Sequence, residues 1–477
     1  MDIDQRITEL AEQDPNRLSF VGVDPTGREE TLSRRELEDG SLAVAQEVAE
    51  AHGAATVVMV TASNDARTLI ELLGVLRSGS LLLLIEPSMA ARSLTALAQR
   101  VADETGCDVW FRGEWLASPE GSEALTAKPS PAGGIVLFTG GTSGDPKVVV
   151  RHGRPSWDPR RGAPLLLQQT GWRAGQTHLV AGGWYHAAPL THLVEALLGG
   201  IKIVTPQVFN PHVVLAALER HRVQWTQLTP SHLQLLAPLL VEHPGALEAL
   251  VGVLHTAGPC APRTRETWME ALGHERLHEM YAATESIGVT LCRADEWLTR
   301  PGTVGRGFFT RIRIYADDGS GPLAPGEVGT VYMRTIASAA NARGPVLNSR
   351  DGFRTVYDMG RLDEEGYLYL EGRRDDQVIV GGENVRLEAV VATLLRHDSV
   401  LDAAVVAVPD LVLGQRLVAL VVPSREGDFR TSLLFHCMTE LAPREVPADI
   451  RLVSSLQRSE AGKLRTTILR DLVTADG

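Results

Sequence analysis

The stretch that decides the fold is Ile135-Val136-Leu137-Phe138-Thr139-Gly140-Gly141-Thr142-Ser143-Gly144-Asp145-Pro146-Lys147. Its four apolar residues predict a buried strand. The glycines that follow let backbone N–H groups approach an anion, hydroxyls add hydrogen bonds, and Lys147 adds positive charge. The spacing does not match a P-loop, in which Lys and Ser or Thr directly follow Gly. We therefore expect a phosphate-binding loop of another architecture. A solvent-exposed hairpin turn is the alternative, because residues 148–150 are typical of a return strand.

The composition is that of a large, acidic protein of ordinary globular type. With 477 residues, 44% of them hydrophobic and 22% charged, the chain predicts two or more domains. A net charge of −13 argues against general nucleic-acid binding, which favours basic surfaces. Anionic ligands therefore need locally placed Lys and Arg side chains.

Three features bear on the compartment. The four cysteines are too widely spaced for a zinc site or a disulfide framework, so we expect reduced thiols in a cytoplasmic protein. The first residues are polar and acidic, unlike a signal peptide. The longest apolar stretch, residues 69–85, is interrupted by Glu71, Arg77 and Ser78, which argues against a membrane span. The oligomeric state is not encoded in any pattern we find.

The order of the expected elements predicts an α/β fold. Residues 56–60, 81–85, 107–111, 223–228 and 250–255 predict strands with helical patterns between them, which implies parallel-type sheets covered by helices. After about residue 300, short strands alternate with turn residues, which favours a small antiparallel subdomain. We expect a large N-terminal domain over residues 1–373 and a small α+β C-terminal domain over residues 374–477.

Further motifs accompany the glycine-rich run. In order along the chain they are Trp184-Tyr185-His186-Ala187-Ala188-Pro189-Leu190, Thr256-Ala257-Gly258-Pro259-Cys260-Ala261-Pro262, Tyr281-Ala282-Ala283-Thr284-Glu285, Phe353-Arg354-Thr355-Val356-Tyr357-Asp358-Met359-Gly360, Gly366-Tyr367-Leu368-Tyr369-Leu370-Glu371-Gly372-Arg373, Gly381-Gly382-Glu383-Asn384-Val385 and Ser459-Glu460-Ala461-Gly462-Lys463-Leu464-Arg465. Their content and order resemble the adenylate-forming enzymes, which include acyl- and aryl-CoA ligases, luciferases and peptide-synthetase adenylation domains. The resemblance is nearest to fatty-acid and aryl-CoA ligases. The chain departs from the family at Gly140, where Ser is usual, and at Val148, Ala282 and Tyr357, where Gly is usual.

The resemblance implies a site for ATP and Mg²⁺. ATP or AMP would be bound by Thr139, Gly140, Gly141, Thr142, Ser143, Gly144, Lys147, Gly258, Pro259, Tyr281, Thr284, Asp358 and Arg373. The Tyr281 ring would pack on adenine, Asp358 would accept hydrogen bonds from the ribose hydroxyls, and Glu285 would hold Mg²⁺. In isolation, the motif at residues 281–285 is equally compatible with a helix start and a surface glutamate. Cys260 is expected to be a packing residue and not a nucleophile.

The same resemblance implies the remaining site residues. The acyl pocket would be lined by Trp184, Tyr185, His186, Ala257, Ala282 and Ile287. His186 would gate the thiol tunnel, with a packed core histidine as the alternative. Lys463 would be the catalytic lysine, and Asp375 would be the hinge about which the mobile C-terminal domain rotates. The loop of Gly381, Gly382 and Glu383 would face the acceptor.

The sequence thus predicts an AMP-forming ligase that activates an aryl or fatty acid and transfers the acyl group to coenzyme A. An amine acceptor is the first alternative, because Arg386-Leu387 replaces the aromatic–proline pair common in CoA ligases. A non-catalytic nucleotide-binding relative is the second alternative. The expected partners are a small carboxylic acid, ATP, and CoA or an amine, with no nucleic acid.

Overall fold

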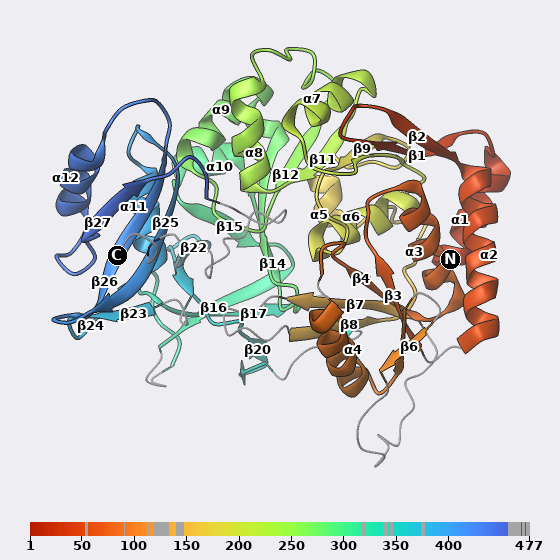
Figure 1. The fold of residues 1–477 in the computed structure, drawn as a ribbon, viewed down its shortest axis with the longest axis horizontal. Helices are drawn as coiled ribbons and strands as arrows, with labels where there is room; N and C mark the ends of the chain where they lie inside the picture. The colour runs from red at the N-terminus through yellow and green to blue at the C-terminus, as the bar shows by residue number, and fades with distance from the viewer. Residues whose placement is uncertain are drawn as a thin grey trace.

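The structure is a computed structural model of the chain. It describes residues 1–52, 56–89, 91–111, 114–117, 133–139, 147–316, 321–336, 342–343, 347–373, 377–456, 469 and 473. In Figure 1 the N-terminal region lies on the right and the C-terminal strands and helices lie on the left.

A fifteen-stranded mixed sheet forms the centre of the molecule. Along its edge-to-edge path the strands are β19 (Ser349–Arg350), β20 (Phe353–Arg354), β17 (Gly329–Thr335), β21 (Asp358–Leu362), β22 (Tyr367–Arg373), β15 (Thr303–Gly307), β14 (Val289–Arg293), β13 (Leu277–Ala282), β12 (Gly252–His255), β11 (Trp225–Leu228), β9 (Thr177–Val180), β10 (Lys202–Pro206), β1 (Leu18–Val23) and β2 (Glu29–Ser33), with β16 (Thr310–Tyr315) paired to β17. The strands from β13 to β1 are parallel, and the pairs on both sides of them are antiparallel.

A seven-stranded sheet carries the glycine-rich run. Its order is β18 (Ala342–Arg343), β8 (Lys147–His152), β7 (Gly134–Thr139), β4 (Leu81–Ile85), β3 (Thr56–Thr61), β5 (Asp108–Phe111) and β6 (Glu114–Ala117). Side chains of a strand alternate between two faces. Val58 and Val60 accordingly lie in one hydrophobic cluster, and Val57 and Met59 lie in another.

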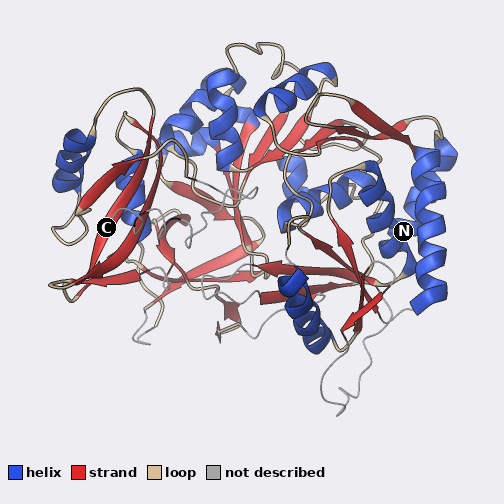
Figure 2. Ribbon diagram, in the orientation of Figure 1, coloured by secondary structure: helices blue, strands red, loops and turns tan. Residues whose placement is uncertain are grey.

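Helices lie between the two sheets and also cover their outer faces (Figure 2). The helices are α1 (Ile3–Gln13), α2 (Arg34–His52), α3 (Ala66–Ser78), α4 (Ala91–Thr105), α5 (Leu165–Gln169), α6 (Ala187–Leu198), α7 (Pro211–Arg220), α8 (Pro230–Leu236), α9 (Pro262–Leu272), α10 (Ala294–Thr299), α11 (Leu387–Leu395) and α12 (Arg430–Glu440). Leu69 of α3 and Leu193 of α6 share a buried cluster with Val58 and Ile203, one from each sheet. These two helices therefore lie between the sheets.

Helix-capping residues mark the ends of several helices. Asn210 caps α7 by accepting from the N–H of His212, and proline occupies the first turn. Asp65 caps α3 by accepting from the N–H of Thr68, and Gly79 ends that helix in the left-handed conformation.

The C-terminal part has its own sheet and core. Strands β25 (Val400–Asp410), β26 (Gly414–Pro423) and β27 (Asp449–Leu452) form a three-stranded sheet, and β23 (Gln377–Val380) pairs with β24 (Glu383–Arg386). Val390 of α11 and Leu433 of α12 are buried against this sheet. The boundary predicted between residues 373 and 374 adjoins residues 374–376, which lie outside the described part of the chain.

The predicted α/β class, with a large N-terminal and a smaller C-terminal domain, is confirmed. One detail differs from the expectation. The antiparallel strands after residue 300 belong to the same continuous sheet as the parallel strands, because β14 pairs antiparallel with both β13 and β15. Among the described residues, no helix has both the length and the apolar character needed to cross a membrane.

Candidate functional site

Three predicted nucleotide-binding residues, on three strands of the central sheet, are joined by hydrogen bonds. Tyr281 lies near the end of β13, Asp358 begins β21, and Arg373 ends β22. The antiparallel register of β21 and β22 places Asp358 opposite Arg373. The Tyr281 hydroxyl donates to Asp358 Oδ2 at 2.5 Å, and Arg373 Nε donates to Oδ1 at 3.1 Å. Residues up to 92 positions apart in the sequence are thus joined through a single carboxylate.

The protonation of this group follows from its surroundings. Burial, together with the neighbouring Asp358 carboxylate, raises the pKa of Tyr281 well above its ordinary value of 10. The phenol therefore stays protonated and remains a donor at physiological pH. The Arg373 side chain is 43% exposed and Asp358 is 16% exposed, so a ligand can reach the pair from solvent.

Left-handed backbone conformations occur at three residues in or beside the predicted motifs. Tyr357 has φ = 67°. Its N–H donates to Thr355 Oγ1 at 2.9 Å, and its hydroxyl is hydrogen-bonded to the Asn348 amide. Ala257 and Ser286 also have positive φ, at 84° and 54°. Such conformations concentrate at functional sites because the surrounding contacts must hold them.

The predicted adenine-side loop lies between β12 and α9. Ala257, Gly258 and Pro259 are all exposed. Beside the loop, burial raises the pKa of the Cys260 thiol to about 11, which favours a packing role over that of a nucleophile.

A buried ion pair supports this loop, and the sequence analysis did not anticipate it. Arg265 of α9 donates to Glu279 Oε2 of β13 at 2.6 Å, and both side chains are less than 10% exposed. Glu279 precedes Tyr281 by two residues, so the pair fixes α9 against the strand that carries the tyrosine. Arg265 lies on a helix and Glu279 on a strand, so no local sequence pattern predicts that the two residues form an ion pair.

The remaining residues of the motif at 281–287 differ in exposure. Ala282 is exposed, and Thr284 and Glu285 are half-buried. Ile287, predicted in the acyl pocket, is buried in a cluster with Met333 and Leu368. Within the described residues, no three His, Cys, Asp or Glu side chains are grouped to hold a metal. A single carboxylate such as Glu285 fits a Mg²⁺ ion that is held mainly by phosphates and water.

The glycine-rich run joins two antiparallel strands. Thr139 at the end of β7 pairs with Lys147 at the start of β8, so the expected return strand is present. The Lys147 side chain is exposed. The described residues do not include Gly140, Gly141, Thr142, Ser143 and Gly144.

The predicted pocket segment leads into α6. Trp184 is fully buried and meets the Phe20 ring edge-on at a centroid distance of 6.0 Å. Tyr185 is also buried, with its ring 4.3 Å from that of His186. His186 is the N-cap residue of α6.

Asn64 holds this segment, a role that the sequence analysis missed. Its amide donates to the carbonyl of Gly182 at 3.2 Å, and its oxygen accepts from the N–H of Trp184 at 3.1 Å. Asn64 has φ = 55°, a conformation that asparagine tolerates better than most residues.

The predicted acceptor loop packs on its own domain. The N–H of Gly381 donates to the carbonyl of Leu413 at 2.9 Å, while Gly382 and Glu383 are exposed. Lys463 and Asp375 lie outside the described residues.

Side-chain hydrogen bonds dock the C-terminal part on the helices of the N-terminal part. Gln234 of α8 donates to the carbonyl of Leu401 at 2.5 Å, and Arg263 of α9 donates to the carbonyl of Asp398 at 2.9 Å. Figure 1 shows the C-terminal strands beside these helices.

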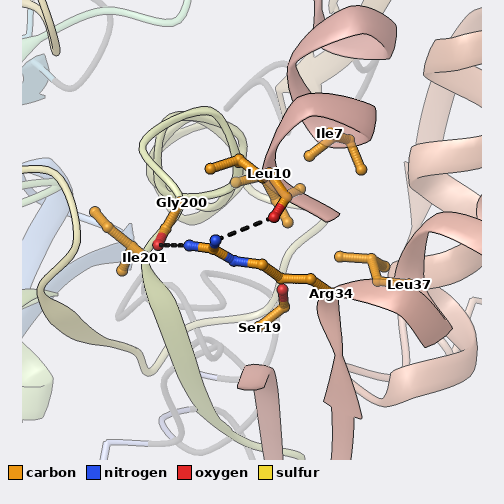
Figure 3. Close-up of a pocket in the computed structure, with 8 residues that line it drawn as sticks. Ile7, Leu10, Ser19, Arg34, Leu37, Gly200 and Ile201 are labelled. Atoms are coloured by element: carbon orange, nitrogen blue, oxygen red, sulfur yellow. Dashed lines mark hydrogen bonds between the residues drawn. The ribbon is translucent and has the colours of Figure 1, made fainter. Parts of the chain in front are cut away.

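A small cavity elsewhere has a structural role. It lies where α1 and α2 approach the end of α6, and the buried Arg34 guanidinium donates to the carbonyls of Leu10 and Gly200, each at 3.1 Å (Figure 3). Its lining includes none of the predicted site residues.

This fold and this arrangement of side chains define a class, the adenylate-forming enzymes. Residues 110–344 match the family model of the AMP-binding enzymes, and residues 390–463 match that of the AMP-binding enzyme C-terminal domain. The two segments together span well over half of the chain, which belongs to this family of AMP-forming ligases.

Curated relatives are CoA ligases. The chain is 28% identical over 370 residues to a sulfoacetate–CoA ligase of Cupriavidus necator, covering 73% of this chain and 69% of the relative. It is 29% identical over 352 residues to a 2-succinylbenzoate–CoA ligase of Bacillus mycoides, covering 71% and 70%.

Solved structures share the whole fold. The o-succinylbenzoate CoA synthetase MenE of Bacillus subtilis, in complex with an acyl-adenylate intermediate, has a TM-score of 0.75 at 21% identity, with 98% of both chains covered. The amide bond synthetase McbA of Marinactinospora thermotolerans has a TM-score of 0.73 at 24% identity, with 99% of this chain and 100% of the other covered.

Proposed function

We propose that this protein activates a carboxylic acid with ATP and then transfers the acyl group to coenzyme A. A carboxylate oxygen attacks the α-phosphorus of ATP, and pyrophosphate leaves with the electrons of the broken P–O bond. The CoA thiolate then attacks the carbonyl carbon of the acyl-adenylate, and AMP leaves. The observation that carries this proposal is the convergence of Tyr281 and Arg373 on the carboxylate of Asp358.

Each group has a physical task in the proposal. The Tyr281 ring offers a flat face for adenine, and Asp358 offers oxygen acceptors for ribose hydroxyls. Lys147 and Arg373 add positive charge near the phosphates, which reduces the repulsion between two anionic substrates. Mg²⁺ held at Glu285 would neutralise phosphate charge.

Lys463 is proposed as the catalytic lysine, and Asp375 as the hinge. We expect Lys463→Ala to reduce acyl-adenylate formation by orders of magnitude and to leave ATP binding largely intact. Single-turnover adenylation and calorimetric ATP binding measure the two effects. Near-normal adenylation by the variant would contradict the role of Lys463.

An amine is the second candidate acceptor. A solved amide bond synthetase matches the fold over almost the whole chain, and Arg386-Leu387 follows the acceptor loop. The two candidates differ in product. A panel of acids is screened by pyrophosphate release, and the best acid is then offered equimolar CoA and a primary amine. A dominant acyl-CoA supports the ligase. Amide without thioester supports the amide synthetase, and no turnover of any acid favours a nucleotide-binding relative without activity.

A further inference from the structure

An arginine lies on the inner face of β8, against α6. Val149 and Arg151 share one face of the strand because side chains alternate, and Val149 lies in the buried cluster that contains Trp184 and Leu190. Arg151 Nη1 donates to Thr191 Oγ1 at 3.0 Å. Thr191 lies five residues after His186, about 7.5 Å along the helix from its start. Arg151 therefore reaches the helix that the predicted pocket segment begins.

No carboxylate in the described part of the chain compensates the charge of Arg151. Its Nε is buried without a hydrogen-bond partner, and burial lowers the pKa of the guanidinium. Glu195, one helical turn beyond Thr191, forms no ion pair with it. Burial raises the pKa of Glu195 to about 7, so this carboxyl is largely neutral just below that pH. A half-buried cation without a compensating carboxylate is stabilised by an anion that approaches from outside the protein.

We propose that Arg151 binds a second anionic group, a carboxylate or a sulfonate, at the end of the acid substrate remote from the carboxylate that is activated. This proposal rests on the proposed function, since it takes residues 184–186 and α6 as a wall of the acid pocket. Lys147 and Arg151 share a face of β8, with Cα atoms about 13 Å apart. Both cations would therefore face the same side of the sheet, at a separation comparable with the length of an acid that carries an anionic group at each end. The planar guanidinium can hold such a group with two parallel hydrogen bonds.

The test compares matched acids by pyrophosphate release. The pairs are pentanoate with glutarate, acetate with sulfoacetate, and 4-oxo-4-phenylbutanoate with 2-succinylbenzoate. We expect the protein to favour the dianionic member of at least one pair at least about tenfold in kcat/KM. Arg151→Met should lower kcat/KM for that acid by about 30-fold or more, the loss expected of a charge-assisted hydrogen-bond pair. The monoanionic member should change little.

A matched control and a second variant show whether the effect is specific to the guanidinium of Arg151. Arg154→Met removes a nearby arginine whose ion pair with Asp2 is 3.6 Å long, and it should leave the preference intact. Arg151→Lys keeps the positive charge but not the planar guanidinium with its paired donors, so it should retain only part of the preference for the dianionic acid. If Arg151→Met does not fold, Arg151→Lys takes its place in the test. Preference for the monoanionic member in every pair, or equal losses for both members, would overturn the proposal.

A binding measurement separates this proposal from the proposed function. If no acid is adenylated, the proposed function fails, and Arg151 is then tested by calorimetry with glutarate and 2-succinylbenzoate in the absence of ATP. Binding by the unmodified protein that Arg151→Met loses supports the anion site. Absence of binding, or equal binding by both proteins, overturns it.

Discussion

Tyr357 shows how a single residue can keep a backbone conformation that its side chain disfavours. A left-handed conformation costs a non-glycine residue about 1–2 kcal/mol, yet Tyr357 has φ = 67°. The hydrogen bonds to Thr355 and Asn348 hold it there. The next residue is Asp358, so this geometry aims the carboxylate that Tyr281 and Arg373 share.

Two substitutions separate the backbone cost from the loss of the ring. Tyr357→Ala and Tyr357→Gly both remove the ring and its hydroxyl, but only glycine adopts positive φ without strain. We expect the glycine variant to be more stable than the alanine variant by about 1 kcal/mol. Thermal unfolding of the two variants measures the difference, and equal midpoints would contradict the strain at this position.

Tyr281→Phe tests the hydroxyl without removing the ring. The variant keeps a face for adenine but leaves Asp358 Oδ2 without its donor. Hydrogen bonds to charged groups contribute about 1.5–3 kcal/mol, so we expect KM for ATP to rise about tenfold or more with a smaller change in kcat. Steady-state kinetics at saturating acid measure both constants.

Tyr369→Phe is the matched control, because the Tyr369 hydroxyl is also hydrogen-bonded to an aspartate, Asp363, at 3.3 Å but outside the predicted site. Equal effects of the two substitutions on KM for ATP would contradict a nucleotide site at Tyr281.

At the scale of elements, α6 carries both a predicted pocket residue and buried titratable groups. It starts at His186, contacts β8 through Thr191, and holds Glu195 in surroundings that raise its pKa from the ordinary 4.5 to about 7. The unfolded chain loses this proton near pH 4.5, whereas the folded protein retains it up to about pH 7. Stability therefore decreases as the pH rises from about 4.5 to 7.

Glu195→Gln should remove this part of the pH dependence. Relative to the unmodified protein, the variant should gain stability between pH 5 and pH 8, by up to about 3 kcal/mol. Denaturant unfolding of both proteins at several pH values measures the gain. Parallel stability curves would show that Glu195 titrates at its ordinary pKa.

Periodic patterns predicted the elements, and contacts between distant segments account for what was missed. The strands at β3, β4 and β12 and the capped start of α7 follow from local apolar patterns and from Asn210-Pro211. The convergence of Tyr281, Asp358 and Arg373 agrees with the motifs, which assign all three to one nucleotide. No sequence motif indicates the Arg265–Glu279 ion pair or the hydrogen bond between Asn64 and Trp184. In each case the two partners lie on different segments of the chain. The assignment of Trp184 and Ile287 to the acyl pocket stays a prediction, because the burial of both side chains fits a pocket wall as well as a core.

At the scale of the whole molecule, the proposed reaction needs two positions of the C-terminal domain. Two of the described docking contacts are the hydrogen bonds of Gln234 with Leu401 and of Arg263 with Asp398, and such hydrogen bonds can be broken and remade. The rotation is proposed to occur at Asp375.

Asp375→Pro should separate the two half-reactions. Proline fixes φ near −65°, so a hinge that needs a large change in φ stays in one position. We expect pyrophosphate release in a single turnover to be nearly unchanged and transfer of the acyl group to the acceptor to fall at least about tenfold. Quenched-flow measurement of both steps tests this, and equal loss of both would contradict the hinge assignment.

The docking contacts have a consequence for building hybrid enzymes. Gln234 and Arg263 both donate to main-chain carbonyl oxygens, which every amino acid possesses. Substitutions at positions 398 and 401 therefore leave both hydrogen-bond acceptors in place. A C-terminal domain transplanted from another member of the family can therefore keep these two hydrogen bonds if it reproduces the course of the backbone there, whichever side chains it carries at positions 398 and 401.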